Sequence, residues 1–137
     1  MQIKFIGAAQ EVTGSKHLIT TKSGKKILLD CGMFQGKGLD TDRMNRELGF
    51  DPKEIDHVIL SHAHIDHSGL IPYIYRLGFS GSVVCTSATR NLCAFMLPDS
   101  GFIQEHDMKW FNKKRAKQGL PPLEAIYKKD DAVQCMK

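Results

Sequence analysis

The sequence lacks the features of a membrane-spanning or secreted protein. Its apolar runs are short, such as Val58-Ile59-Leu60, whereas a membrane-spanning helix needs roughly 20 apolar residues. The first residues, MQIKFIGAAQEVTG, contain one Lys, and Gln10 and Glu11 interrupt their apolar patch, so the apolar core of a secretory signal is missing. We therefore expect a cytoplasmic protein with no membrane partner.

The cysteines of the sequence also indicate neither a metal site nor a disulfide framework. The four cysteines form no C-x-x-C motif, and we expect reduced thiols of an intracellular protein rather than a disulfide framework. The sequence has no internal repeat and no low-complexity linker. A content of 42% hydrophobic and 25% charged residues, in 137 residues, indicates one globular domain or part of one.

A large excess of one charge is absent as well, because the net charge is only +4. Five basic residues nevertheless cluster within nine positions: Lys109, Lys113, Lys114, Arg115 and Lys117. Such a cluster could contact phosphates, or it could be a solvated helix face. Trp110 and Phe111 lie beside it and could stack on bases, although we favour burial of an amphipathic helix face.

The order of elements predicts an α/β layered domain. Apolar segments predict strands at residues 2–6, 17–21, 26–30, 57–60 and 82–86, and the continuous run 27–29 indicates a strand buried on both faces. Ser68 is expected to cap a helix over residues 69–77 that stops at Gly78. A second helix is expected from Ser87 toward Lys117, kinked or divided at Pro98.

Three of the six histidines lie within six residues, in the segment LSHAHIDHSGLIP. Residues i and i+2 of a strand share a side, so a turn after the strand 57–60 can direct His62 and His64 to one point. Asp66 and His67 follow and can face a second point close by. Mixed imidazole and carboxylate ligands suit zinc best, with manganese and iron as alternatives. The interpretation without metal is a set of surface histidines on a polar loop.

This pattern resembles a known signature. His62-x-His64-x-Asp66-His67 is similar to the H-x-H-x-D-H motif of the metallo-β-lactamase superfamily, and LLDCG resembles the earlier strand-end Asp motif of that family. The segments EVTGSKHL, LLDCGMFQG, LSHAHIDHSGLIPYIYRLGFSG and MLPDSGFIQEHD together resemble the amino-terminal part of its β-CASP branch, the nucleases that process RNA and DNA.

The resemblance implies the αββα sandwich of that superfamily with two zinc ions at the sheet edges. It assigns His62 and His64 to one zinc, and Asp66 and His67 to the other. Asp30 would orient the site, and its alternative role is a strand-end Asp that accepts loop N–H groups. In the implied reaction, a metal-activated hydroxide attacks a phosphodiester. Asp66 and Asp30 are the catalytic candidates, with Asp66 as the residue that holds and deprotonates the water.

The resemblance also implies ligands that this sequence does not supply. The superfamily's site needs a further His for the first zinc, an Asp that bridges the two ions, and another His for the second zinc, and the β-CASP insertion is missing too. Residues 1–137 are therefore expected to be the N-terminal portion of a metallo-β-lactamase domain. His17, His57 and His106 are expected to be structural or exposed rather than substitute ligands.

The strands suffice for about one of the two sheets of a sandwich, which leaves an apolar face to be covered. We expect the missing remainder of the domain, another chain or a second copy in a homo-oligomer to cover it. Gly14, Ser15 and the segment from Gly32 to Gly38 could line a substrate entrance, or their glycines could serve turn geometry alone.

The function that follows is that of a zinc-dependent hydrolase, a nuclease acting on RNA rather than DNA. Two alternatives stay open. The same motif would suit hydrolysis of a small ester, thioester or lactam, and an inactive fragment or non-catalytic scaffold could keep half of the metal site. Zinc content distinguishes the inactive fragment from a complete site, because a complete site holds two ions per chain and a half-site none, or one weakly. A β-CASP insertion downstream would decide against the small-molecule hydrolase.

Overall fold

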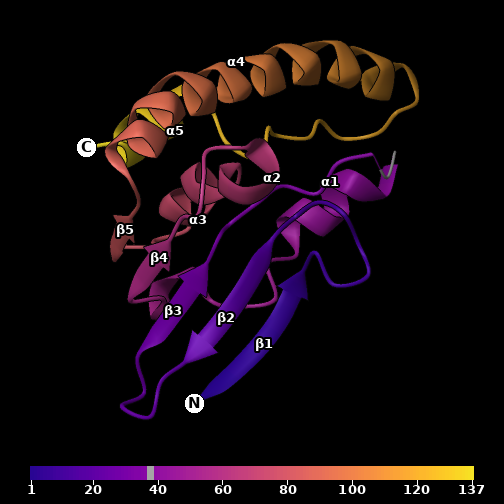
Figure 1. The fold of residues 1–137 in the computed structure, drawn as a ribbon. Helices are drawn as coiled ribbons and strands as arrows, with labels where there is room; N and C mark the ends of the chain where they lie inside the picture. Colours follow the sequence, from indigo (N-terminus) through magenta and orange to yellow (C-terminus); the bar gives the residue numbers. More distant parts are fainter. Residues whose placement is uncertain (37–38) are drawn as a thin grey trace.

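The computed structural model of the protein describes residues 1–36 and 39–137, and its centre is a five-stranded sheet (Figure 1). The strands lie in the order β1 (Gln2–Gly7), β2 (Lys16–Thr20), β3 (Lys26–Leu29), β4 (His57–Ile59) and β5 (Ser82–Val84). β1, β2 and β3 are antiparallel neighbours, whereas β3, β4 and β5 are parallel. The predicted strands are confirmed, with boundaries shifted by one or two residues.

The helices complete an α/β fold, and α3, α4 and α5 are stacked over one side of the sheet (Figure 1). The helical elements are α1 (Leu39–Arg46), the 3-10 turn η1 (Pro52–Glu54), α2 (Ile65–Ser68), α3 (Ile71–Arg76), α4 (Ser87–Lys117) and α5 (Lys129–Cys135). The hydroxyl of the fully buried Tyr127 donates to Ser100 Oγ of α4 at 2.9 Å, which fixes the chain that returns from α4. All four cysteines are free, as predicted.

Only one face of the sheet is covered. Leu28 and Val58 are register partners that face the helices, and neither has exposed surface. The next row across the sheet, on the other face, is Phe5, His17, Leu29, Ile59 and Val84. In this row Phe5 is 66% exposed and Val84 is 56% exposed. Burial of segment 27–29 on both faces is therefore a wrong prediction, because residues 1–36 and 39–137 form no second layer, whereas the expected uncovered apolar face is confirmed.

The helix after the histidine turn starts later than predicted. The chain first forms α2 and then begins α3 at Ile71, with Pro72 in the first turn. Ser68 does not cap α3, because its buried hydroxyl donates to the Ala63 carbonyl oxygen at 2.8 Å. Gly78 follows the helix with φ 101° and stops it, as predicted.

The long helix α4 continues through Pro98, so the predicted division of the helix is wrong, whereas the predicted kink stays a prediction. Packing on both sides of the proline explains the continuity, because Leu97 is 1% exposed and Gly101 lies against α5. A Cβ on Gly101 would come within 2.7 Å of Lys129 N, so the two helices touch at this glycine. No helix of the described residues, α4 included, is both long and apolar enough to cross a membrane.

Candidate metal centre

The predicted site lies where the parallel strands β3 and β4 end. Parallel strands present their carboxyl ends at the same edge of a sheet, which brings the residues after Leu29 and after Ile59 together. Asp30 N donates to the Ile59 carbonyl oxygen at 2.9 Å and so ties the two strand ends. The side chain of Asp30 then faces the turn that carries the histidines, since its Oδ2 lies 2.8 Å from His67 Nδ1.

Asp30 anchors the site. It is 4% exposed, and its φ of 58° is a left-handed conformation that Asp tolerates better than most residues. Its Oδ1 accepts the Ser61 N–H at 2.8 Å. Its Oδ2 accepts from Ser61 Oγ at 3.0 Å, Ser15 Oγ at 3.3 Å and His67 Nδ1 at 2.8 Å. One carboxylate thus joins three loops, and it accepts both a loop N–H and the ring N–H of His67, a predicted ligand.

In the neutral form of His62 and His67, this carboxylate also selects the tautomer of each ring. A carboxylate only accepts, so His67 Nδ1 must donate to Asp30 and the free lone pair lies on Nε2. The Ser61 hydroxyl gives its one hydrogen to Asp30 and therefore accepts from His62 Nδ1 at 2.9 Å. Both imidazoles consequently present an unprotonated Nε2, the atom that can bind a metal.

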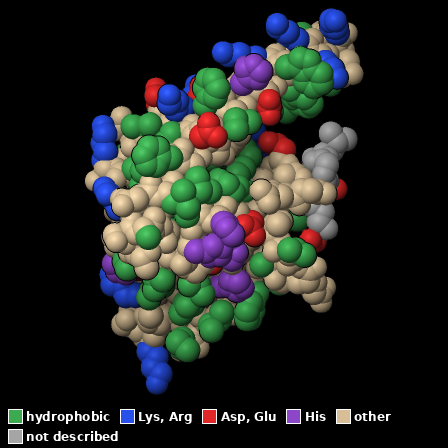
Figure 2. Space-filling view, turned by 45° about the horizontal axis from the view of Figure 1, so that its top comes forward, with side chains coloured by type: hydrophobic (Ala, Val, Ile, Leu, Met, Phe, Trp, Pro, Cys, Tyr) green, Lys and Arg blue, Asp and Glu red, His purple; other side chains and the backbone are tan. Residues whose placement is uncertain are grey.

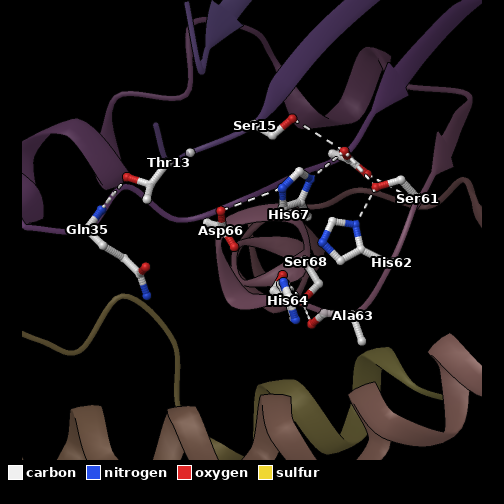
Figure 3. A network of polar contacts seen from close by, with 12 residues as sticks. Thr13, Ser15, Gln35, Ser61, His62, Ala63, His64, Asp66, His67 and Ser68 are labelled. Atoms are coloured by element: carbon white, nitrogen blue, oxygen red, sulfur yellow. Dashed lines mark hydrogen bonds and ion pairs between the residues drawn. The ribbon is translucent and has the colours of Figure 1, made fainter. Parts of the chain in front are cut away.

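The three histidines of the turn form a compact cluster (Figure 3). The ring centroid of His62 is 4.7 Å from that of His64 and 4.1 Å from that of His67. His64 precedes the first turn of α2, and its side chain makes no capping hydrogen bond to that helix. The structure therefore brings together the two residues predicted to share one metal.

The second predicted pair is also close. His67 Nε2 lies 3.6 Å from Asp66 Oδ2. Two ligands of one tetrahedral zinc, each about 2.0–2.1 Å from it, are about 3.3 Å apart, so this pair fits zinc in donor chemistry and spacing. Within residues 1–36 and 39–137, no group of three or more His, Cys, Asp or Glu side chains is placed to hold a metal ion. The described residues thus supply donors in pairs, and the assignment of metals to them stays a prediction.

Backbone hydrogen bonds hold the turn of residues 62–67 against two neighbouring loops. We call this turn, which carries the four predicted ligands, the ligand turn. Ser15 N donates to the Asp66 carbonyl oxygen at 2.9 Å, and Gly32 N donates to the Ser15 carbonyl oxygen at 2.9 Å. Cys31 N donates to the His67 carbonyl oxygen at 2.7 Å. Asp66 and His67, two of the predicted ligands, are therefore fixed through their main chain, and His67 also through its side chain.

The loop residues considered for a substrate entrance are mostly interior. Gly14 and Gly32 are buried, and Ser15 is 7% exposed, so their role is close packing beneath the ligand turn rather than lining an entrance. Gly14 has φ 80°, and a Cβ there would lie 2.5 Å from the Phe34 ring. Gly36 is exposed, and Lys37 and Gly38 lie outside the described residues.

A buried lysine supports these loops, and sequence reasoning missed it. Lys16 has no exposed surface, and its Nζ donates to the carbonyl oxygens of Gly14 at 3.1 Å and Gly32 at 2.7 Å. It also lies 4.2 Å from the centroid of the Phe34 ring, a cation–π distance. Burial lowers the pKa of Lys16 to about 8, and the charge of the nearby Cys31 acts in the opposite direction.

This shift predicts a pH-dependent difference between the protein and its Lys16→Met variant. The folded pKa of about 8 is below the ordinary 10.5, so between these values the unfolded state binds more protons, and the cost of burying the charge disappears as pH rises. The stability of the wild type relative to the variant should therefore increase by about 3 kcal/mol from pH 7 to pH 10.5. Urea unfolding at both pH values measures it, and a Cys31→Ala background removes the coupled thiol. Parallel pH profiles would contradict the prediction.

The remaining histidines are structural or exposed, as predicted. His57 Nδ1 contacts Ser82 Oγ at 2.8 Å, and the ring of His17 packs edge-on against Phe5 with centroids 5.3 Å apart. The His106 side chain is 75% exposed. None of the three therefore completes the cluster around His62 and His67.

The fold and the site define a class of protein: an α/β domain with histidine and aspartate side chains of metal-ligand chemistry at the ends of parallel strands. The family model described as the metallo-beta-lactamase superfamily matches residues 13–131. The chain belongs to this superfamily.

Curated relatives agree with this assignment. The chain is 43% identical over 92% of its length to Ribonuclease TTHA0252 of Thermus thermophilus. It is 36% identical over 80% of its length to Probable RNase MJ4 of Methanocaldococcus jannaschii, and 34% identical over 87% to Transcription termination factor FttA of Methanothermobacter thermautotrophicus. A solved metallo-β-lactamase of Cronobacter sakazakii, described by its HARLDQ motif, is 24% identical with a TM-score of 0.49 and covers 67% of this chain and 31% of its own.

The chain spans only a part of these relatives. The matched segments make up 28% of Ribonuclease TTHA0252, 24% of Probable RNase MJ4 and 19% of the termination factor. This chain therefore corresponds to less than a third of each curated relative.

Proposed function

We propose that the complete natural protein is a zinc-dependent ribonuclease of the β-CASP branch, which hydrolyses phosphodiester bonds of RNA. The observation that carries this proposal is the 43% identity, over 92% of this chain, to a protein named ribonuclease. Relatives named probable RNase and transcription termination factor support RNA as the substrate class.

The side chains of the site have distinct roles in this proposal. His62 and His64 hold one zinc, and Asp66 and His67 hold the other. Zinc, when bound, lowers the pKa of water and neutralises charge on the phosphate. Asp66 orients the attacking water and accepts its proton, and its side chain is 24% exposed, so substrate water can reach it.

Asp30 acts through other residues and is a positioning residue. It is buried and fully engaged with Ser15, Ser61 and His67, so it does not reach solvent. Its contribution is to keep the Nε2 atoms of His62 and His67 unprotonated and pointed at the metals. Our proposal assigns Asp30 this positioning role, and the catalytic role considered for it from the sequence stays a prediction.

The two alternatives are less well supported. Hydrolysis of a small ester, thioester or lactam has no support among the relatives named here that cover 80% or more of this chain. The alternative of a non-catalytic fragment applies to residues 1–137 taken alone, because the described residues form no group of three or more side chains that could hold a metal ion. We accordingly expect residues 1–137 in isolation to be inactive.

The test is Asp66→Ala in the complete natural protein. With zinc and an end-labelled single-stranded RNA, the wild type should cleave, chelation should stop cleavage, and the variant should lose about 10²- to 10⁴-fold in kcat. Asp130→Ala, at an exposed position of α5, is the matched control and should keep full activity.

Three substrates separate the candidate functions. A DNA strand of the same sequence tests the preference for RNA, and a chromogenic lactam and a thioester test the small-molecule alternative. Cleavage of DNA at the rate of RNA would remove the RNA preference, and turnover of the small molecules without RNA cleavage would replace the proposal. Full ribonuclease activity of Asp66→Ala would refute the role given to that carboxylate.

A further inference from the structure

The net charge of the chain is concentrated in one short segment. Residues 108–123 contain five Lys and Arg and no Asp or Glu. The rest of the chain has fourteen basic residues against fifteen acidic ones, since the totals are 19 and 15. The excess of positive charge therefore lies entirely at the carboxyl-terminal end of α4.

The basic side chains of this helix end are aligned. Lys109, Lys113 and Lys117 follow one another at intervals of four residues, so they form one row, and Trp110 and Lys114 form the adjoining row. All five residues are exposed. We call this surface, made of Lys109, Trp110, Lys113, Lys114 and Lys117, the basic stripe.

The opposite side of the helix end is fixed by the returning chain. Asn112 makes two hydrogen bonds of 2.8 Å with the main chain of Leu123, and Arg115 Nε donates to the Pro121 carbonyl oxygen at 2.7 Å. Figure 1 shows the end of α4 extending over this returning segment, and Figure 2 shows Lys and Arg gathered at the projecting end. The basic stripe is thus held facing outward.

Trp110 gives the stripe a second property. Its side chain is 60% exposed, and Lys114 Nζ lies 3.7 Å from its ring centroid. Burial, which we favoured from the sequence, is therefore wrong for Trp110, while Phe111 on the other side is half-buried. An exposed aromatic ring among cations matches single-stranded nucleic acid, which offers phosphates to pair and bases to stack.

A membrane surface fits less well. A helix that lies on a membrane needs a broad apolar face beside its basic one. The other exposed large apolar side chains of α4, Leu92, Phe95, Phe102 and Ile103, lie six or more residues before Lys109, so Trp110 is the one apolar side chain within the stripe itself. Within residues 1–36 and 39–137, the structure records no ion pair to an acidic side chain for Lys109, Lys113 or Lys117. These three ammonium groups are available to an anionic partner.

We propose that the basic stripe is a docking site for single-stranded RNA, on a different element from the predicted metal ligands. Lys109, Lys113 and Lys117 would pair with successive phosphates, and Trp110 would stack on a base. The proposal rests on the proposed function for the identity of the polymer. The docking site would add a contact with the RNA strand at a distance from the phosphodiester bond that is cleaved.

The test is RNA binding without metal, measured on the complete natural protein. Fluorescence anisotropy of a labelled 12-nucleotide RNA in EDTA reports binding without cleavage. Replacing Lys109, Lys113 and Lys117 together by Gln should lower the affinity roughly 50-fold at 0.15 M salt and reduce the slope of log K against log salt by about 2. Trp110→Leu should lower the affinity about 10-fold.

The control is a triple variant with the same change of charge at other exposed lysines, Lys22→Gln, Lys53→Gln and Lys137→Gln, which should bind RNA as the wild type does. Equal RNA binding by the two triple variants would overturn the docking site. A stripe triple variant that no longer binds phosphatidylserine vesicles but binds RNA as the wild type does would also overturn the docking site, in favour of a membrane surface.

The two proposals fail in different ways. Cleavage of RNA in zinc, with RNA affinity insensitive to the stripe, would refute the docking site and leave the ribonuclease in place. RNA binding in EDTA that depends on the stripe, together with no RNA cleavage in zinc, would support the docking site and refute the ribonuclease. Circular dichroism of each variant checks that these surface changes leave the fold intact.

Discussion

Replacing Asp30 by Asn is expected to lower the affinity of the complete natural protein for zinc by about 10- to 100-fold. Asn has the same shape, and its oxygen can still accept the Ser61 N–H that Asp30 Oδ1 accepts at 2.8 Å. The amide nitrogen that replaces Oδ2 is a donor, so it opposes the His67 Nδ1–H and the Ser61 hydroxyl hydrogen. His67 can relieve this only by moving its proton to Nε2, which blocks the metal-binding atom.

Two measurements check this prediction. Calorimetric titration with zinc gives the affinity, and ¹⁵N chemical shifts of the imidazoles identify the protonated nitrogen of His67. Asp56→Asn is the matched control, because Asp56 also accepts a backbone N–H, from Lys26 at 2.8 Å, but does so at the opposite end of the strands. Unchanged zinc affinity, or a proton that stays on Nδ1 of His67, would contradict the role assigned to Asp30.

The positions of the residues predicted as ligands could be inferred from the sequence because they follow from strand geometry. The carboxyl ends of parallel strands meet at one edge, so the residues after Leu29 and Leu60 had to be neighbours. The partners that select the tautomers could not be predicted in the same way. Ser61 and Ser15 reach Asp30 from segments 31 and 15 residues away in sequence, and nothing in their own sequence context distinguishes them from ordinary loop serines.

Lys16 was missed because lysine is rarely buried, although a signal existed. Alternation along β2 puts Lys16 on the same side as Leu18, and Leu18 pairs with the fully buried Leu28. The burial is possible only because the carbonyl oxygens of two distant loops converge on Nζ. A contact of this kind depends on the closed fold and has no local pattern.

The errors at Pro98 and Trp110 have opposite physical origins. At Pro98 a local rule predicted a kink or a division, and packing on both sides of the proline prevented the division. At Trp110 the composition of the helix suggested burial, but the helix end extends beyond the core and only its other side is covered by the returning chain. Both depend on where α4 lies relative to α5 and to the loop 118–128, which the sequence pattern does not determine.

Replacing Gly32 by Ala is expected to disrupt both folding and the site. Gly32 packs against the ligand turn so closely that a Cβ would lie 1.6 Å from the Asp66 carbonyl oxygen and 2.7 Å from His67 N. Main-chain atoms cannot rotate away as a side chain does, so the turn that carries Asp66 and His67 must shift. We expect a loss of about 3 kcal/mol or more in stability and, because a displacement of about 1 Å is costly in catalysis, a loss of about 100-fold in activity.

Alanine variants of two other glycines serve as comparisons that separate the loss of stability from the damage to the site. All three variants are measured by urea unfolding, zinc titration and RNA cleavage. Gly24 has φ 85° with nothing within 4 Å of a Cβ, so Gly24→Ala measures backbone strain alone, about 1 kcal/mol. Gly101→Ala brings a Cβ within 2.7 Å of Lys129 N, far from the ligand turn in sequence, and should lower stability while zinc affinity is retained. Only Gly32→Ala should lose stability and zinc affinity together, because it alone adds an atom against the main chain of two predicted ligands. A Gly32→Ala protein that unfolds like Gly24→Ala and binds zinc normally would refute the close packing of this loop beneath the site.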